Sequence, residues 1–136
     1  MLERLRDAAN SHDAQRFAAL FADDYESVQP LHPSRSFRGS AQVLSNWTSV
    51  FEGVPDFTSE VLSSVVDGET EWGEWEWRGH YRDGSPFAVR GVMIVVATNG
   101  LVTRARLYME PVDVVDAGDI DSAVQEMYRP PSGESA

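Results

Sequence analysis

The fold of this chain is decided by a tryptophan-rich stretch, residues 71–81, which reads EWGEWEWRGHY. Neighbouring side chains of a β-strand point to opposite faces of the sheet. One face carries Gly73, Trp75, Trp77, Gly79 and Tyr81, and the other carries Trp72, Glu74, Glu76, Arg78 and His80. We expect the first face to be buried, because aromatic side chains commonly fill protein cores. Trp75 and Trp77 would then be core residues, walls of a ligand cavity, or both.

Turn signals place this strand in an antiparallel meander. Asp67-Gly68, Asp83-Gly84 and Asn99-Gly100 separate runs of alternating apolar residues. Such dipeptides are the strongest short-range signals for a hairpin. The predicted strands are residues 57–66, 71–82, 87–97 and 101–109.

The first half of the chain predicts helices instead. Apolar residues recur at helical spacing from Leu2 to Ala9. A second helix should begin after Asp13, a favourable N-cap, and end at Asp23-Asp24. Ser40 should cap a third helix, which stops at residues 53–55, where a glycine and a proline occur.

Helices followed by a meander indicate an α+β protein. We predict a cone-shaped, curved antiparallel sheet with three N-terminal helices that enclose a hydrophobic pocket. A short edge strand at residues 25–28 would complete the sheet. This domain should span residues 1–112, followed by an acidic extension, residues 113–136, with a short helix from Asp119 to Tyr128.

Composition excludes several classes of function. The 136 residues fit one domain, no cysteine is present, and all 11 basic residues are arginine. Thiol nucleophiles, thiolate zinc sites and lysine Schiff bases are therefore excluded. The three histidines lack metal-ligand spacing, so we expect no metal and no cofactor.

Charge and hydropathy bear on partners and location. The net charge of −11 argues against nucleic acid and anionic membranes as partners. The longest apolar run, residues 92–97, is too short to span a bilayer. We expect a cytoplasmic protein.

Seven short segments form an ordered series along the chain. They are FAALFADDY at 17–25, PLHP at 30–33, FRG at 37–39, WEWRG at 75–79, RGV at 90–92, GLV at 100–102 and YME at 108–110. Their order and spacing resemble those of the SnoaL-like polyketide cyclases, within the nuclear transport factor 2-like superfamily. The resemblance covers residues 2–112 and implies the cone fold, commonly as a dimer. It implies a function among those of ketosteroid isomerases, epoxide hydrolases, dehydratases and non-catalytic binders.

The catalytic sets of those relatives are not intact in this chain. Their acid–base groups, oxyanion-holding groups and water-activating groups align with residues of other types. The aligned positions hold Leu5, Gln29, Trp75, Trp77, Tyr81, Met93 and Leu107. Catalysis would therefore need a different set of residues.

Glu26 is the main candidate for an acid–base residue. It shares strand parity with Val28, so we expect both side chains to point inward. A carboxyl group in a tryptophan-lined pocket is desolvated and can act as a general acid or base near neutral pH. The alternative is an exposed glutamate at a helix end. Tyr81 would present its phenol to the cavity or pack in the core, and His32 would border the cavity mouth or face solvent.

The other side chains expected to point inward indicate which kind of ligand the pocket would bind. Gln29 would orient a substrate carbonyl, or would only form a turn with Pro30. The apolar candidates for ligand contact are Val28, Trp47, Phe51, Trp75, Trp77, Met93 and Leu107. Such a lining suits a flat hydrophobic small molecule.

Two functions stay open. The first is a cofactor-independent enzyme that cyclises, isomerises, dehydrates or opens an epoxide of a polyketide- or terpenoid-like substrate. The second is a non-catalytic protein that binds a hydrophobic ligand in the same pocket. Aromatic and arginine residues on the outward face predict a homodimer; they are Trp72, His80, Arg90, Arg106 and Tyr108.

Overall fold

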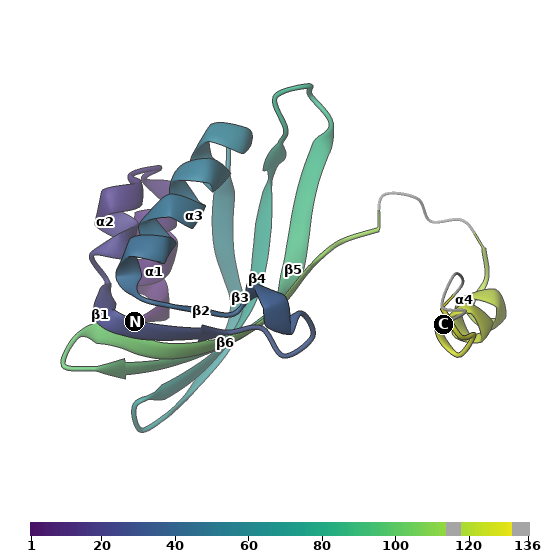
Figure 1. Cartoon of the computed structure of the whole chain (residues 1–136). Helices are drawn as coiled ribbons and strands as arrows, with labels where there is room; N and C mark the ends of the chain where they lie inside the picture. Colours follow the sequence, from purple (N-terminus) through teal and green to yellow (C-terminus); the bar gives the residue numbers. More distant parts are fainter. Residues whose placement is uncertain (114–117, 132–136) are drawn as a thin grey trace.

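The computed structural model describes residues 1–113 and 118–131 (Figure 1). The helices are α1 (Leu2–Asn10), α2 (Ala14–Ala18), α3 (Ser40–Gly53) and α4 (Ile120–Met127), with a 3₁₀ turn, η1 (Pro33–Arg35). The strands are β1 (Phe21–Val28), β2 (Phe37–Arg38), β3 (Thr58–Asp67), β4 (Thr70–His80), β5 (Pro86–Thr98) and β6 (Leu101–Pro111). The predicted helices and meander strands are present with shifted ends.

The six strands form one sheet in the order β2-β1-β6-β5-β4-β3. Strands β3 to β6 pair antiparallel, as predicted. Helices α1, α2 and α3 lie on one face of the curved sheet (Figure 1), which confirms the predicted α+β cone. The prediction of an edge strand at residues 25–28 is wrong, because β1 pairs with β6 on one side and with β2 on the other.

Strand β4 buries the face that the tryptophan pattern predicts. Trp75 is 1% exposed, and Trp77 packs against the core. On the opposite face Glu76 forms ion pairs with Arg78 at 3.0 Å and with Arg90 of β5 at 3.6 Å. The predicted orientation of both tryptophans is confirmed.

Two glycines allow close packing around β4 and β5. A Cβ atom at Gly73 would lie 2.8 Å from the indole nitrogen and 2.7 Å from Leu2 of α1. Gly91 is the partner of Trp75 on β5, and a Cβ atom there would overlap the carbonyl oxygen of Tyr108. Leu2 of α1 and the Trp75 indole therefore fit against Gly73, and the β6 backbone fits against Gly91, only because these positions lack a side chain.

The chain enters the sheet earlier than predicted. Helix α2 ends at Ala18, so Asp23 and Asp24 lie inside β1 rather than at a helix end. The pairing of β1 with β6 is irregular between Phe21 and Glu26, and the two aspartates are both exposed. In the second half of β1 the buried residues are Tyr25 and Ser27, which is the opposite alternation to the predicted one.

Of the two predicted helix caps, Asp13 is confirmed and Ser40 is wrong. Asp13 caps α2, as predicted, by accepting a hydrogen bond from a first-turn backbone N–H. Asp119 caps α4 in the same way, within the predicted helical range. The N-cap of α3 is Gly39 rather than Ser40, and its φ of 103° lies in the left-handed region that favours glycine.

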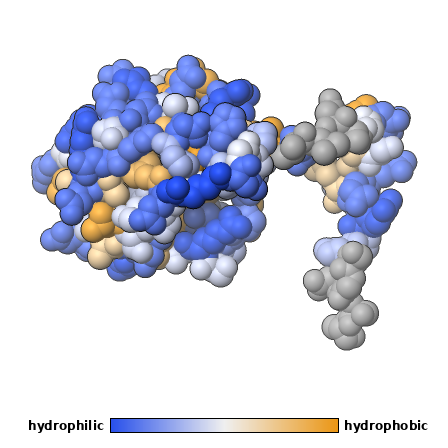
Figure 2. Space-filling model, turned by 90° about the horizontal axis from the view of Figure 1, so that it is seen from above, coloured by the Kyte–Doolittle hydropathy of each residue, from blue (hydrophilic) through white to orange (hydrophobic). Residues whose placement is uncertain are grey.

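Hydrophilic residues dominate the face of the molecule seen in Figure 2, with apolar patches between them. Within residues 1–113 and 118–131, no helix combines the length and apolarity needed to cross a membrane. Residues 114–117 and 132–136 of the predicted acidic extension lie outside the described residues.

Candidate ligand-binding site

A cavity lies between the helices and the inner face of the sheet. Its volume is about 190 Å³, larger than a cavity of roughly 150 Å³ that is known to hold benzene. The aromatic lining consists of Phe17, Phe21, Tyr25, Phe37, Trp47, Trp75 and Trp77. The aliphatic lining consists of Leu5, Ala9, Val43, Val50, Met93, Val95, Ala105 and Leu107.

The aromatic walls hold one another in place. The Trp47 ring centroid lies 4.2 Å from that of Phe17 and 5.4 Å from that of Trp77. On the β1 side, the rings of Phe21 and Tyr25 meet edge to face at 4.7 Å. Tilted and edge-to-face contacts of this kind are favourable, so a flat ligand would meet a preformed surface.

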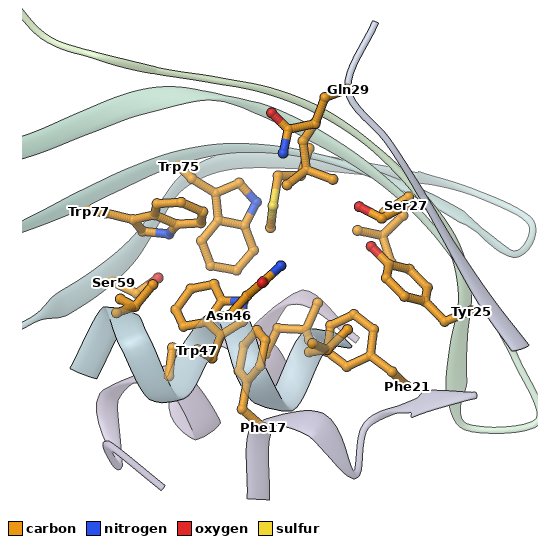
Figure 3. A pocket seen from close by; sticks show the side chains of 18 of the residues that line it. Phe17, Phe21, Tyr25, Ser27, Gln29, Asn46, Trp47, Ser59, Trp75 and Trp77 are labelled. Carbon is orange, nitrogen blue, oxygen red and sulfur yellow. The ribbon is translucent and has the colours of Figure 1, made fainter. Parts of the chain in front are cut away.

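Two buried polar atoms of the lining have no hydrogen-bond partner among the described residues. They are the indole nitrogen of Trp75 and the hydroxyl oxygen of Ser59. Figure 3 shows the nitrogen edge of Trp75 directed into the cavity. An unsatisfied buried donor costs about 1–3 kcal/mol, and a ligand acceptor placed beside it would remove that cost.

The side chains of Tyr25 and Ser27 on β1 form a second polar group in the cavity lining. Burial raises the pKa of Tyr25 to about 12, and a hydrogen bond from Ser27 lowers it in part. The Tyr25 phenol is therefore protonated at neutral pH and can donate a hydrogen bond. Both oxygens are directed toward the cavity in Figure 3.

Two amide side chains complete the polar lining. Gln29 follows β1, and Asn46 reaches into the cavity from α3 (Figure 3). Gln42 donates a hydrogen bond to the amide oxygen of Asn46 at 2.8 Å. This contact leaves the Asn46 nitrogen as the donor that faces the cavity.

The described side chains that line the cavity carry no formal charge. Among the described residues that form it, Tyr25 is the one titratable side chain, and no carboxylate, imidazole or guanidinium is present. In the same described part of the chain, no group of three or more histidine or acidic side chains is placed to hold a metal ion. The side chains described in the lining can therefore donate hydrogen bonds.

The structure brings most of the predicted ligand-binding residues together. The cavity wall includes Gln29, Trp47, Trp75, Trp77, Met93 and Leu107. Their role in binding stays a prediction.

The predicted inward orientation of Glu26 and Val28 is wrong. Glu26 forms ion pairs with Arg38 of β2 at 2.6 Å and with Arg104 of β6 at 3.4 Å. Neither Glu26 nor Val28 is part of the cavity lining. Phe21, Tyr25 and Ser27 share one strand parity and all line the cavity, so Glu26 has the outward parity and the acid–base role predicted for it loses its geometric basis.

The other two catalytic candidates also lie away from the cavity. Tyr81 follows the end of β4 in a turn, where its side chain is 47% exposed and touches the edge of Phe87. His32 binds Glu110 with its Nε2 atom 2.6 Å from a carboxylate oxygen, and it does not line the cavity.

Phe51 was predicted to contact the ligand, but it does not line the cavity. Its ring stacks on His12 at 5.3 Å and meets Phe57 at 5.9 Å. It supports Trp47 from behind, at a ring distance of 5.6 Å, and is not part of the lining.

Sequence reasoning missed four polar residues of the site: Tyr25, Ser27, Asn46 and Ser59. The signal for Asn46 was available, because Val43, Trp47 and Val50 share its helical face at intervals of three and four residues. A polar residue inside an apolar stripe indicates a buried contact. Tyr25 and Ser27 share strand parity with Phe21, which also lines the cavity, and the sequence prediction had assigned the opposite parity to the inward face.

Solved structures with the same fold are numerous. A candidate ketosteroid isomerase from Kribbella flavida is 20% identical, with a TM-score of 0.65, over 97% of this chain and 88% of that chain. A candidate polyketide cyclase from Sinorhizobium meliloti is 19% identical, with a TM-score of 0.62, over 80% and 92%. A candidate isomerase from Bacillus subtilis is 15% identical, with a TM-score of 0.71, over 80% and 83%. At these identities the likeness establishes the fold.

No curated protein matches the chain significantly. The family comparison is more informative, because the model of the SnoaL-like domain matches residues 2–105. This range contains α1 to β5 and the first half of β6, and with them every residue that lines the cavity except Leu107. The chain belongs to the SnoaL-like domain family.

Proposed function

We propose that this protein binds a flat, hydrophobic small molecule that carries a hydrogen-bond acceptor such as a carbonyl oxygen. The observation that carries the proposal is the unpartnered Trp75 indole N–H, which points into an aromatic cavity. Polyketide- and terpenoid-like ketones combine these two properties. The bound carbonyl oxygen would accept a hydrogen bond from Trp75, with Tyr25 and Asn46 as further donors.

Binding is favoured over acid–base catalysis by the nature of the lining. A general acid or base must lie within about 2.6–3.2 Å of the proton it transfers and works best with a pKa near the operating pH. Glu26, the one strand carboxylate predicted for this task, is held by two arginines instead. Tyr25, with a pKa of about 12, serves as a donor and not as a base.

A second candidate is an enzyme of the cyclase or isomerase type, and the protonated Tyr25 favours it. The phenol of Tyr25 and the indole of Trp75 would stabilise negative charge that develops on a substrate carbonyl oxygen. The candidate cyclase and isomerases among the structural neighbours fit this function. A proton acceptor would have to come from the substrate or from water.

The first test uses 1-tetralone, a bicyclic ketone, and tetralin, which lacks the carbonyl. Binding is followed by calorimetry with the wild type and with Trp75→Phe, which keeps an aromatic ring and removes the donor. A neutral hydrogen bond contributes about 1 kcal/mol, so Trp75→Phe should weaken 1-tetralone about fivefold and leave tetralin unchanged. Failure of both compounds to bind, or an equal loss for both, would contradict the proposal.

The same ketone separates binding from catalysis. Exchange of its α-protons in D₂O, followed by NMR, measures stabilisation of the enolate. An enzyme should accelerate the exchange, and Tyr25→Phe should reduce that acceleration about 10²-fold, as for loss of one oxyanion donor. Unchanged exchange in the presence of bound 1-tetralone would leave ligand binding as the function.

A further inference from the structure

A polar hollow at the surface adjoins the apolar cavity, and we call it the outer hollow. The two spaces share three lining residues: Gln29, Phe37 and Asn46. The shared residues stand at the junction of the two spaces, so a molecule that extends past them from the cavity would enter the outer hollow.

The rest of the outer hollow is polar. It is lined by Ser34, Arg35 and Ser36, at η1 and the residue after it, and by Gln42 of α3. Arg35 is the only charged residue of this lining among those described. None of the ion pairs in residues 1–113 and 118–131 involves it. In a chain of net charge −11, an arginine without an acidic partner is available to an external anion.

The segment that carries Arg35 is held in a fixed position. The Arg35 backbone N–H donates to the His32 carbonyl at 2.9 Å, and the Ser36 hydroxyl accepts from the Gln29 backbone N–H at 3.1 Å. Directly after it, Phe37 pairs with Ser27 of β1. The strand that lines the cavity therefore also positions the outer hollow.

One side-chain contact links the two spaces. Gln42 lines the outer hollow, and its amide donates to Asn46, which lines both. A polar group of the ligand at this junction would meet fixed amides, not loose side chains. The polarity of the lining thus changes in one direction, from aromatic inside to cationic outside.

We propose that the ligand is an amphipathic anion, with a flat apolar body in the cavity and an anionic end, such as a carboxylate or phosphate, at Arg35. This rests on the proposed function, because the apolar body must first occupy the cavity. A guanidinium binds such anions through two parallel hydrogen bonds. The serine hydroxyls beside it add donors for the same oxygens.

The test uses two fluorescent probes that differ in one group. 8-Anilinonaphthalene-1-sulfonate is anionic, and N-phenyl-1-naphthylamine is the same molecule without the sulfonate. Both are titrated into the wild type, Arg35→Gln and Arg16→Gln. Arg16 lies exposed on α2, away from both linings, and its substitution changes the net charge equally.

Arg35→Gln should weaken the sulfonate probe about fivefold, in the range of an exposed but bidentate ion pair. It should leave the neutral probe unchanged, and Arg16→Gln should affect neither probe. The wild-type affinity for the sulfonate should also fall with added salt, and that dependence should be reduced in Arg35→Gln. Circular dichroism and thermal unfolding check that both variants fold.

Two outcomes distinguish a failure of this inference from a failure of the proposed function. If the neutral probe binds and Arg35→Gln leaves the affinity for the sulfonate probe unchanged, Arg35 does not bind the anionic end, and the inference is overturned. If the neutral probe does not bind the wild type, the proposed hydrophobic site itself fails.

Discussion

The two faces of the sheet are built from the same strands but differ in charge. Strand β4 places Trp75 inward and Glu76 outward, and β1 places Tyr25 inward and Glu26 outward. Each outward glutamate lies between two arginines. The inward side chains form an uncharged aromatic wall. Strand alternation therefore keeps the acidic groups of a strongly acidic protein away from its cavity.

Because of this separation, the two faces should contribute differently to stability and to ligand binding. The inner face combines burial with unpartnered donors, so changes there should alter both folding and binding. The outer face combines exposed charges in pairs, which individually contribute little. Substitutions at matched positions of the two faces test the difference.

The largest effect is expected from Trp75→Ala. The side chain is 1% exposed, and truncating a buried aromatic residue costs about 3–5 kcal/mol. Urea unfolding should show this loss, whereas Arg78→Ala on the outer face of the same strand should change stability by less than about 0.5 kcal/mol. Equal losses for the two variants would contradict the assignment of the faces.

A second prediction concerns the outer face as an interface. Trp72 is 43% exposed and its β3 partner Val65 is 64% exposed. Aromatic and arginine residues are enriched at interfaces, and we propose that this face forms a homodimer. Light scattering should give twice the chain mass of 15.1 kDa, and Trp72→Glu should give the monomer. A wild-type monomer at micromolar concentration would refute the dimer.

The third prediction uses alkaline pH. The pKa of Tyr25 is raised from 10.0 to about 12 in the folded protein. The native state then keeps this proton while the unfolded state loses it, so stability is complete below pH 10 and falls as pH rises toward 12. Between pH 9 and 11.5 the wild type should lose about 2 kcal/mol relative to Tyr25→Phe in urea unfolding. Parallel pH profiles would show that the phenol is not buried.

The strands also show how far sequence patterns predict this site. On β4 the side chains alternate between the two faces even where the pairing with β3 shifts register, opposite Trp75, so Trp75 and Trp77 were placed correctly. On β1 the prediction turned Glu26 and Val28 inward, whereas Tyr25 and Ser27 line the cavity; an error of one residue in the assigned parity exchanges the two faces. Tyr81 was misplaced because β4 ends at His80, one residue before it.

The chemistry of the site depends on packing features that the sequence pattern does not show. The Trp75 nitrogen lacks a partner because of how the indole packs over Gly73, a feature of three-dimensional packing. Asn46, by contrast, lies on the same helical face as Trp47 and was accessible to sequence reasoning. The fold and the aromatic wall could thus be predicted, and the orientation of the donors could not.

The smallest effect is expected from Glu26→Gln. Glu26 lies one residue after Tyr25 and on the other face, where Arg38 and Arg104 hold its carboxylate. The variant should lose at most about 1 kcal/mol of stability, as for surface ion pairs, and 1 M salt should remove most of that difference. Its affinity for 1-tetralone and the rate of α-proton exchange should stay within twofold of the wild type, whereas Tyr25→Phe should change at least one of them. If Glu26→Gln instead lowers either quantity tenfold while the protein remains folded, the carboxylate reaches the cavity, and β1 adopts a different register in solution.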